Sequence, residues 1–359
     1  MSETLAWSVY SDPEVLALER RRIFERSWQY AGHLGQVEQP GDYFACAAGH
    51  VPVAVVRDED EELHAFLNVC RHRGSEVVRG SGNRKTLQCG YHAWTYGLDG
   101  SLRSAPRSER EPGFDPEGLS LLPMQIETLG PWIFVNPDTD APPLSEIAGG
   151  IAESLASGGI EPDSLVFHRR IDFGLEANWK VVIENYRECY HCPTAHPDFS
   201  RAVDVNPDRY ELHTAEWSSS QYGRARNGGE PIDVGQFHYL WPNTRINVFP
   251  GPPNLSIGPA LPLGPERTAG FFDYFFTEDV PLDAREELIA FDSQVGSEDR
   301  ALIESVQRGM RSGLLDHGTL MPESERLIAH FQALVGRTLR GSGAEPGRSL
   351  APRAPADQP

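Results

Sequence analysis

The chain has 359 residues, and its 52 acidic residues outnumber its 32 basic residues, which gives a formal net charge of −20 at pH 7. This charge argues against a nucleic-acid partner, because phosphate contacts need clustered lysine and arginine. Hydrophobic residues make up 39% and charged residues 23%, as in a soluble globular protein of about two domains. The sequence has no apolar run long enough to span a bilayer and no secretory signal at its start, so we expect a cytoplasmic protein with no membrane partner.

Residues 1–30 form the first predicted segment, which we expect to pack on the larger domain. Within it, residues 12–30 have the apolar periodicity of an amphipathic helix, which Asp12 can cap and whose first turn suits Pro13. From residue 31 to 140 the pattern changes to short β-rich runs separated by turns. This change predicts a small all-β domain over residues 31–140.

A second domain is predicted over residues 141–340, after a Pro-rich boundary. Runs of strands and runs of helices follow one another in it, which predicts the α+β fold class. We expect helices over 145–156, 176–191, 283–294, 297–311 and 322–339, a strand over 166–175, and further strands between 208 and 277. The last residues, 341–359, are rich in Gly, Pro and Ala and are predicted to be disordered.

Two short pairs of potential metal ligands lie in the first domain, Cys70-x-His72 and Cys89-x-x-His92. The chain has five cysteines, an odd and sparse number for a disulfide scaffold, so metal ligation is the more interesting use. Zinc could bind all four residues in one tetrahedron, but zinc modules usually pair like residues. A Rieske [2Fe–2S] cluster takes two thiolates on one iron and two imidazoles on the other. The mixed pairs therefore favour a Rieske cluster over zinc.

A second candidate site lies at the end of the helix predicted over 176–191, where His191 is followed by His196. Five residues apart on an unbroken helix, the two imidazoles would point about 140° away from each other. Pro193 lies between them and would end or kink the helix, so that His196 can turn back. Glu188 precedes His191 by three residues, shares its face and is placed to hydrogen-bond it.

Two histidines and one carboxylate form the facial triad of non-haem Fe(II) oxygenases, which leaves positions open for O2 and substrate. The best candidate for the carboxylate is Asp299, because it lies on an apolar helical stripe, whereas Glu298 is rotated away from it. The apolar residues of that stripe are Leu302, Ile303 and Val306.

The residues of this second site could also have purely structural roles. Ser297 could cap a helix in which Glu298 and Asp299 are ordinary first-turn acids that offset the helix dipole. The two histidines could be satisfied structural residues. Cys189 and Cys192, on the same predicted helix as His191, are expected to be thiols of the core or pocket and not metal ligands.

Together, CRHRG…CGYHAWTYGLDG at 70–100 and ENYRECYHCPTAH at 184–196 resemble the Rieske non-haem iron oxygenases, the ring-hydroxylating oxygenase α-subunit-like family. The resemblance implies a small Rieske domain followed by a helix-grip catalytic domain, an antiparallel sheet wrapped around a helix. It also implies a Rieske [2Fe–2S] cluster held by Cys70, His72, Cys89 and His92, and a mononuclear Fe(II) held by His191, His196 and Asp299.

The resemblance assigns Glu188 as the bridging acid, which would link a cluster histidine of one subunit to the iron histidine of its neighbour, and Asn185 as a pocket asparagine on the same helix. It further implies a homotrimer. The partner would be an NAD(P)H-dependent reductase that carries flavin and an iron–sulfur centre, alone or with a ferredoxin. The substrates would be O2 and a small organic molecule.

The segment 184–196 looks closest to the branch of the family that acts on quaternary amines such as glycine betaine, choline or carnitine. This predicts hydroxylation of an N-methyl group or of the adjacent carbon, aided by an aromatic cage around the cation. Available aromatic residues are Trp217, Tyr222, Phe237, Tyr239, Trp241 and Phe249. The alternatives are a dioxygenase or monooxygenase of an aromatic acid and, more remotely, a Rieske electron carrier fused to a ligand-binding module.

Overall fold

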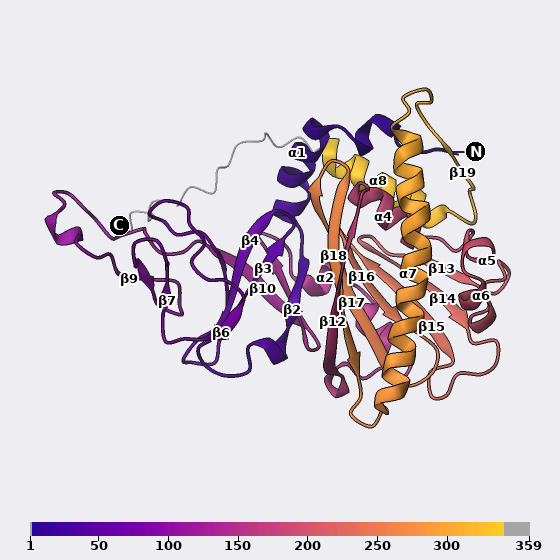
Figure 1. The fold of residues 1–359 in the computed structure, drawn as a ribbon, viewed down its shortest axis with the longest axis horizontal. Helices are drawn as coiled ribbons and strands as arrows, with labels where there is room; N and C mark the ends of the chain where they lie inside the picture. The colour runs from indigo at the N-terminus through magenta and orange to yellow at the C-terminus, as the bar shows by residue number, and fades with distance from the viewer. Residues whose placement is uncertain (1, 341–359) are drawn as a thin grey trace.

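The computed structural model describes residues 2–340, which build two large β-sheets that lie side by side (Figure 1). The tail predicted to be disordered, residues 341–359, lies outside the described residues. No helix within residues 2–340 is long and apolar enough to cross a membrane.

The first sheet has seven antiparallel strands in the order β2-β11-β10-β5-β4-β3-β6, and a three-stranded sheet β7-β8-β9 accompanies it. The loops that follow β5 and β7 carry the two Cys/His pairs. The strands are β2 (Gln29–His33), β3 (Asp42–Ala48), β4 (Val51–Arg57), β5 (Leu63–Leu67), β6 (Ser81–Asn83), β7 (Leu87–Gln88), β8 (Thr95–Tyr96), β9 (Leu102–Ser104), β10 (Pro123–Leu129) and β11 (Trp132–Asn136).

The second sheet has seven antiparallel strands in the order β12-β18-β17-β16-β15-β14-β13, so the first and last strands of the order are its edges. Its strands are β12 (Val166–Leu175), β13 (Glu211–Thr214), β14 (Ser218–Arg224), β15 (Val234–Leu240), β16 (Thr244–Val248), β17 (Asn254–Gly264) and β18 (Arg267–Phe276). The predicted strand over 166–175 and the predicted strands between 208 and 277 are confirmed.

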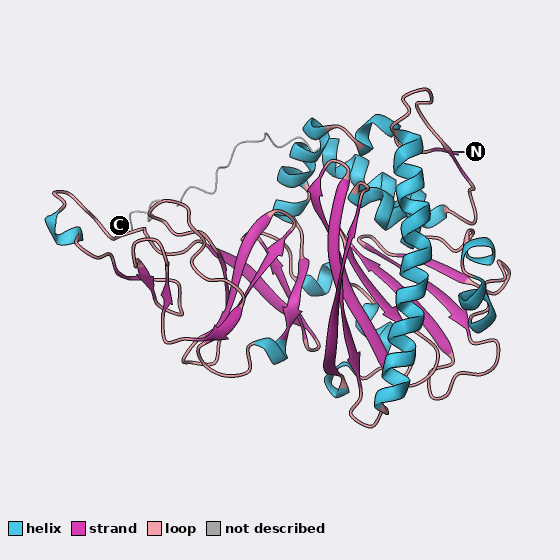
Figure 2. Cartoon of the chain, viewed as in Figure 1, coloured by secondary structure: helices cyan, strands magenta, loops and turns pink. Residues whose placement is uncertain are grey.

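Helices cover the second sheet, and the longest of them, α7 (Leu282–Met310), runs across its strands (Figure 2). The other helices are α1 (Pro13–Arg22), α2 (Leu144–Ile147), α3 (Ile151–Ser157), α4 (Trp179–Tyr186), α5 (Cys192–Ala195), α6 (Pro197–Ala202) and α8 (Arg326–Arg340). Strand β1 (Ser2–Glu3) pairs with β19 (Thr319–Leu320), which joins the start of the chain to the segment before α8. The predicted α+β class is confirmed.

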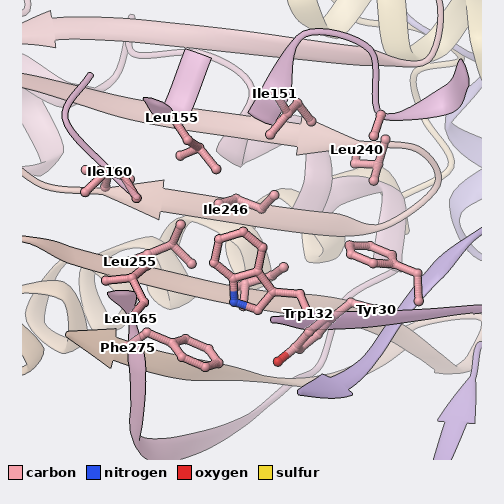
Figure 3. Packing of buried hydrophobic residues seen from close by; sticks show 14 of the residues in the cluster. Tyr30, Trp132, Ile151, Leu155, Ile160, Leu165, Leu240, Ile246, Leu255 and Phe275 are labelled. Atoms are coloured by element: carbon pink, nitrogen blue, oxygen red, sulfur yellow. The ribbon is translucent and has the colours of Figure 1, made fainter. Parts of the chain in front are cut away.

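Strand β16 contributes side chains to the hydrophobic core from one face and to a cavity from the other. Successive side chains of a strand point to opposite faces. Ile246 therefore enters the core that the second sheet shares with Tyr30 and Trp132 of the first (Figure 3). Its neighbours Arg245 and Asn247 point to the opposite face, where they line a cavity.

Three helix predictions need correction at their ends. The helix predicted over 12–30 ends at Arg22, because the chain turns into strand β2 at Gln29, although Asp12 does cap its start by accepting from the amide of Glu14 at 2.7 Å. The helix predicted over 145–156 is split at a pair of glycines into α2 and α3. The last helix begins at Arg326.

The break predicted at Gly296 is wrong, because α7 continues through it as one helix of 29 residues. A glycine inside a helix costs only about 1 kcal/mol relative to alanine, and no proline accompanies it here. A Cβ added at Gly296 would meet no atom within 4 Å, and the residue borders the cavity. Gly296 therefore keeps room in the cavity without interrupting the helix.

A buried ion pair ties α1 to α4. The Lys180 Nζ lies 2.6 Å from Glu19 Oε1, and both side chains are 0% exposed. The indole of Trp179 donates to the other carboxylate oxygen of Glu19 at 2.8 Å. The start of the chain is thus anchored to the helix that precedes His191.

We predict that Lys180→Met lowers the free energy of unfolding by about 3–5 kcal/mol, because it leaves the charge of Glu19 buried without its partner. Urea unfolding followed by tryptophan fluorescence measures the change. The double variant Glu19→Gln/Lys180→Met should lose less than the single variant, since no uncompensated charge remains. A single variant as stable as the wild type would contradict this account.

Candidate functional site

The two Cys/His pairs meet in the loops beside β7 and β8, with their thiols inside and their imidazoles outside. Cys70 and Cys89 are 3% and 2% exposed, whereas His72 and His92 are exposed. The two imidazole rings lie 4.6 Å apart between centroids. Separate thiol and imidazole layers match the two irons of a Rieske cluster and are not what one tetrahedral zinc requires.

Aromatic side chains hold these ligands in place. The Tyr96 hydroxyl lies 3.3 Å from Cys70 Sγ, and the indole of Trp94 stacks on the His72 ring at 5.0 Å with an interplanar angle of 8°. Gly74 has φ +72°, and a Cβ there would meet nothing within 4 Å, so the loop leaves open space beside the pairs.

The thiol of Cys89 is adapted to bind a metal as a thiolate. Burial raises the pKa of Cys89, but hydrogen bonds from the backbone amides of Tyr91 and His92 and from the side chain of Cys70 outweigh it, and the net pKa is lowered. Because the thiolate is the form that ligates metal, the loop favours the state that a cluster needs.

A second group of ligands forms where the segment after α4 meets the middle of α7. His191 Nε2 and His196 Nε2 lie 3.1 Å apart, and Asp299 Oδ1 lies 3.0 Å from the latter and 3.5 Å from the former. Ligand atoms about 2.1 Å from an octahedral metal, in neighbouring positions, lie about 3.0 Å apart. The three atoms therefore match one face of an octahedron and leave the remaining positions free for O2 and substrate.

The triangle formed by the ligand atoms of His191, His196 and Asp299 is electrostatically suited to a cation. Desolvation lowers the pKa of His191, but hydrogen bonds to Asp299 and Glu188 outweigh it and raise the pKa to about 9. Desolvation likewise raises the pKa of Asp299, but its contacts with both histidines hold the pKa at about 2. The site attracts positive charge, which either protons on the imidazoles or a metal ion can supply.

Two further carboxylates contact the Nδ1 atoms of the two histidines and so orient their rings. Glu188 accepts a hydrogen bond from Nδ1 of His191, and Glu298 lies 2.7 Å from Nδ1 of His196. Each imidazole thus presents Nε2 to the centre, as metal-binding histidines commonly do. The contact of Glu298 was missed from the sequence, which only showed that this residue points away from the stripe of Asp299.

The path of the chain between α4 and α5 differs from the prediction. The helix predicted over 176–191 ends at Tyr186, so Glu188 and His191 lie in a turn and not on a helical face. Glu188 still reaches His191, because its carboxylate accepts the backbone amide of His191 at 3.1 Å. Pro193 lies in the first turn of the short helix α5 and does not end a longer one.

Cys189 and Cys192 are not the free thiols that the sequence suggested. The turn brings their Cα atoms to 4.9 Å, a distance that a disulfide spans, and the structure joins them. The bond closes a small ring around His191. Cys46, Cys70 and Cys89 are free within the described chain.

Asp299 lies in the middle of α7, so the alternative that it is a first-turn acid is excluded. The stripe predicted around it is only partly correct. Ile303 is buried beside it at 4% exposure, but Leu302 and Val306 are 38% and 45% exposed. The inner face of α7 is narrower than predicted and continues through Gln307, which is buried at 0% exposure.

A cavity of about 110 Å³ opens on the triangle, and its wall includes Asn185, Asp299, Phe237 and Phe249. The side-chain amide of Asn185 donates to Asp299 Oδ1 at 3.1 Å, so this residue positions the carboxylate. Of the six aromatic residues considered from the sequence, only these two phenylalanines line the cavity. The other four line different pockets or the core: Trp217, Tyr222, Tyr239 and Trp241.

Two charged residues of the cavity were missed by sequence reasoning, Arg245 on β16 and Asp292 on α7. Arg245 is 8% exposed, although its strand is otherwise buried. A charged residue inside a short β-rich run was the available signal. The sequence could not show which face of the sheet this residue occupies.

Comparisons with known proteins agree with this geometry. Residues 162–341 match the ring hydroxylating alpha subunit (catalytic domain), and residues 27–123 match the Rieske [2Fe-2S] domain. The chain is 35% identical to the carnitine monooxygenase oxygenase subunit of Acinetobacter baumannii, over 93% of this chain and 95% of the relative. It is 32% identical to the chloroplastic choline monooxygenase of Spinacia oleracea, over 93% of this chain and 77% of the relative. The chain belongs to the Rieske oxygenases.

This Rieske oxygenase is also similar to solved structures. A crystal structure of the quaternary ammonium Rieske monooxygenase CntA in complex with an inhibitor has a TM-score of 0.86 at 34% identity and covers 94% of this chain and 95% of that one. Another, at 33% identity and a TM-score of 0.85 over the same shares of the two chains, is described as giving insights into carnitine oxidation and inter-subunit electron transfer. Naphthalene 1,2-dioxygenase shares the fold at 21% identity and a TM-score of 0.76.

Membership of this family confirms the predicted enzyme class and cofactors. The protein is an oxidoreductase with a Rieske [2Fe–2S] cluster and a mononuclear iron. The zinc protein and the fused electron carrier, which were the competing interpretations of the sequence, are thereby set aside.

We predict that Asp299→Ala removes the mononuclear iron and leaves the visible spectrum of the cluster unchanged, because it deletes one of three ligand atoms. Glu298→Ala should retain the iron but bind it about 10–100-fold more weakly, since it only frees Nδ1 of His196. Iron and acid-labile sulfide, measured on the same samples, separate the two effects. Full mononuclear iron in Asp299→Ala would show that another residue is the ligand.

Proposed function

We propose that this Rieske oxygenase is the terminal oxygenase component that hydroxylates a small quaternary amine, at an N-methyl group or at the adjacent carbon. The observation that carries the proposal is the cavity, which is lined both by the triangle of His191, His196 and Asp299 and by aromatic residues. Ring faces attract quaternary ammonium groups through cation–π interactions. Relatives named for carnitine and choline, which are both quaternary amines, support the same substrate class.

We further propose the role of each candidate residue. When bound, the cluster supplies electrons and the mononuclear iron supplies the O2 site. Asn185 positions the carboxylate of Asp299, and Glu188 holds the Nδ1 proton of His191. The residues that would hold the cluster are Cys70, His72, Cys89 and His92, and those that would hold the iron are His191, His196 and Asp299.

The two sites lie at opposite ends of the subunit, with the loops around β7 and β9 at one end and α5 at the other (Figure 1). This separation supports a homotrimer, in which the cluster of one subunit would lie beside the iron site of the next. Glu188 would bridge that boundary, from His191 to a cluster histidine of the neighbour. A partner reductase with flavin and an iron–sulfur centre, alone or with a ferredoxin, would draw electrons from NAD(P)H, which suits a cytoplasmic enzyme.

Oxygen uptake with a panel of quaternary amines and aromatic acids tests the proposed substrate class. With a competent reductase, carnitine, choline or glycine betaine should raise O2 uptake and NAD(P)H oxidation together. Formaldehyde as a product would identify attack on N-methyl, and trimethylamine would identify attack on the adjacent carbon. Coupled uptake with aromatic acids alone would overturn the proposal.

We predict that Glu188→Gln keeps both metal sites filled and lowers coupled turnover by at least about 100-fold, because the amide oxygen can still accept a hydrogen bond from Nδ1 of His191 but lacks the negative charge of the carboxylate. Rapid mixing with reduced reductase should show that the cluster still accepts an electron. Glu59→Gln, on an exposed turn, is the matched control and should turn over normally. Normal coupled activity in Glu188→Gln would remove this residue from the electron path.

A further inference from the structure

Arg245 occupies an unusual position for a charged residue. It is the second residue of β16 (Thr244–Val248), a central strand, and is 8% exposed. The alternation of β16 places its side chain on the face of the sheet that lines the iron cavity, together with Asn247. A cation in this position is costly unless something compensates it.

The surrounding protein compensates the guanidinium only in part. Its carbon lies 4.5 Å from the ring centroid of Phe272, 5.0 Å from that of Phe173 and 5.8 Å from that of Tyr186. These ring faces are favourable for a cation but accept no full hydrogen bond. Nε and Nη2 of Arg245 are buried and have no hydrogen-bond partner within the described chain. Two nitrogens of the guanidinium, which together carry three N–H donors, are therefore unsatisfied within the wall of the substrate cavity.

Acidic residues line the same cavity but do not pair with Arg245. Asp292 instead lies 2.7 Å from the hydroxyl of Tyr274 and 3.5 Å from that of Ser256. Asp299 is engaged by the two histidines. Among residues 2–340, no carboxylate forms an ion pair with Arg245. The cavity thus presents separate positive and negative groups to whatever enters it.

We propose that Arg245 binds the carboxylate of the substrate, and that the substrate is a zwitterion with a quaternary ammonium at one end and a carboxylate at the other. This inference rests on the proposed function and narrows it. A guanidinium presents parallel N–H donors that match the two oxygens of a carboxylate. Asp292 and the phenylalanine rings of the cavity would face the ammonium end. Carnitine, glycine betaine and γ-butyrobetaine fit this description, and choline, which has no carboxylate, does not.

The competing explanation is that Arg245 only offsets the charges of Asp292 and Asp299 at a distance. In that case the guanidinium would never touch the substrate. Its loss would then disturb every substrate equally, since the disturbance would act through the iron site. The two explanations therefore differ in whether the effect of a substitution depends on the charge of the substrate.

The test compares each acid with its methyl ester, which keeps the quaternary ammonium and removes the negative charge. Carnitine, glycine betaine and γ-butyrobetaine provide three such pairs. The readouts are kcat/KM from coupled O2 uptake and, independently of turnover, anaerobic binding by calorimetry. The wild type should prefer at least one acid over its ester by roughly 30-fold or more, the usual effect of losing one partner of a buried charge pair.

Variants locate the preference in one side chain. Arg245→Met should lose the acid and keep the ester, so that the preference disappears, whereas Arg245→Lys should restore part of it through charge alone. Arg308→Met, on the exposed face of α7, is the matched control and should keep the wild-type preference. Iron content and the cluster spectrum show whether each variant is folded and loaded.

Three outcomes would overturn the inference. The wild type could oxidise esters and choline as well as the acids, a result that needs no variant and holds even if Arg245→Met does not fold. Alternatively, Arg245→Met could lose acid and ester equally while both metal sites are filled. If the wild type neither binds nor oxidises any quaternary amine, charged or neutral, the proposed function fails as well. Only that last result concerns the function, so the two failures are distinguishable.

Discussion

The contact on which the rest of the catalytic half depends is the one between Asp299 and the two histidines. Asp299 comes from the middle of a helix of 29 residues, and the histidines come from a turn about a hundred residues earlier in the chain. Their three ligand atoms lie 3.0–3.5 Å apart in a triangle. The electrostatic environment of this triangle is negative, so a divalent ion would stabilise it. The second sheet, helix α7 and the carboxylates of Glu188 and Glu298 position this triangle so that it faces one cavity.

The electrostatics of the cavity follow from the same arrangement. Asp299, Glu188 and Glu298 surround two imidazoles and leave a surplus of negative charge, whereas desolvation and the nearby charge of Asp299 raise the pKa of Asp292 to about 6, so that its carboxylate is more easily neutralised. Arg245 lines the same cavity, and burial lowers its pKa only to about 10, so it stays charged at neutral pH. Groups of both signs in one cavity are what the proposed zwitterionic substrate requires.

Features that depend on neighbouring residues could be predicted from the sequence, whereas features that depend on contacts between distant segments could not. Mixed Cys/His pairs specify their chemistry within a few residues, so the cluster site could be recognised directly. The strand over 166–175 was predicted at its observed bounds because strand-like composition is a local signal. The break at Gly296 was wrong because glycine lowers helix stability only slightly, and packing along α7 outweighs that cost. Arg245, Asp292 and the partner of Glu298 could not be found, since the sheet brings them together across strands and helices distant in sequence.

If one subunit carries two separate iron centres, the iron and acid-labile sulfide contents of anaerobically purified, fully loaded protein will show both. Two irons and two sulfides belong to the Rieske cluster, and the triangle of His191, His196 and Asp299 adds one iron without sulfide. We expect about three irons for every two sulfides in each chain. A ratio of one iron to one sulfide, in a sample that nevertheless turns over substrate, would contradict this expectation.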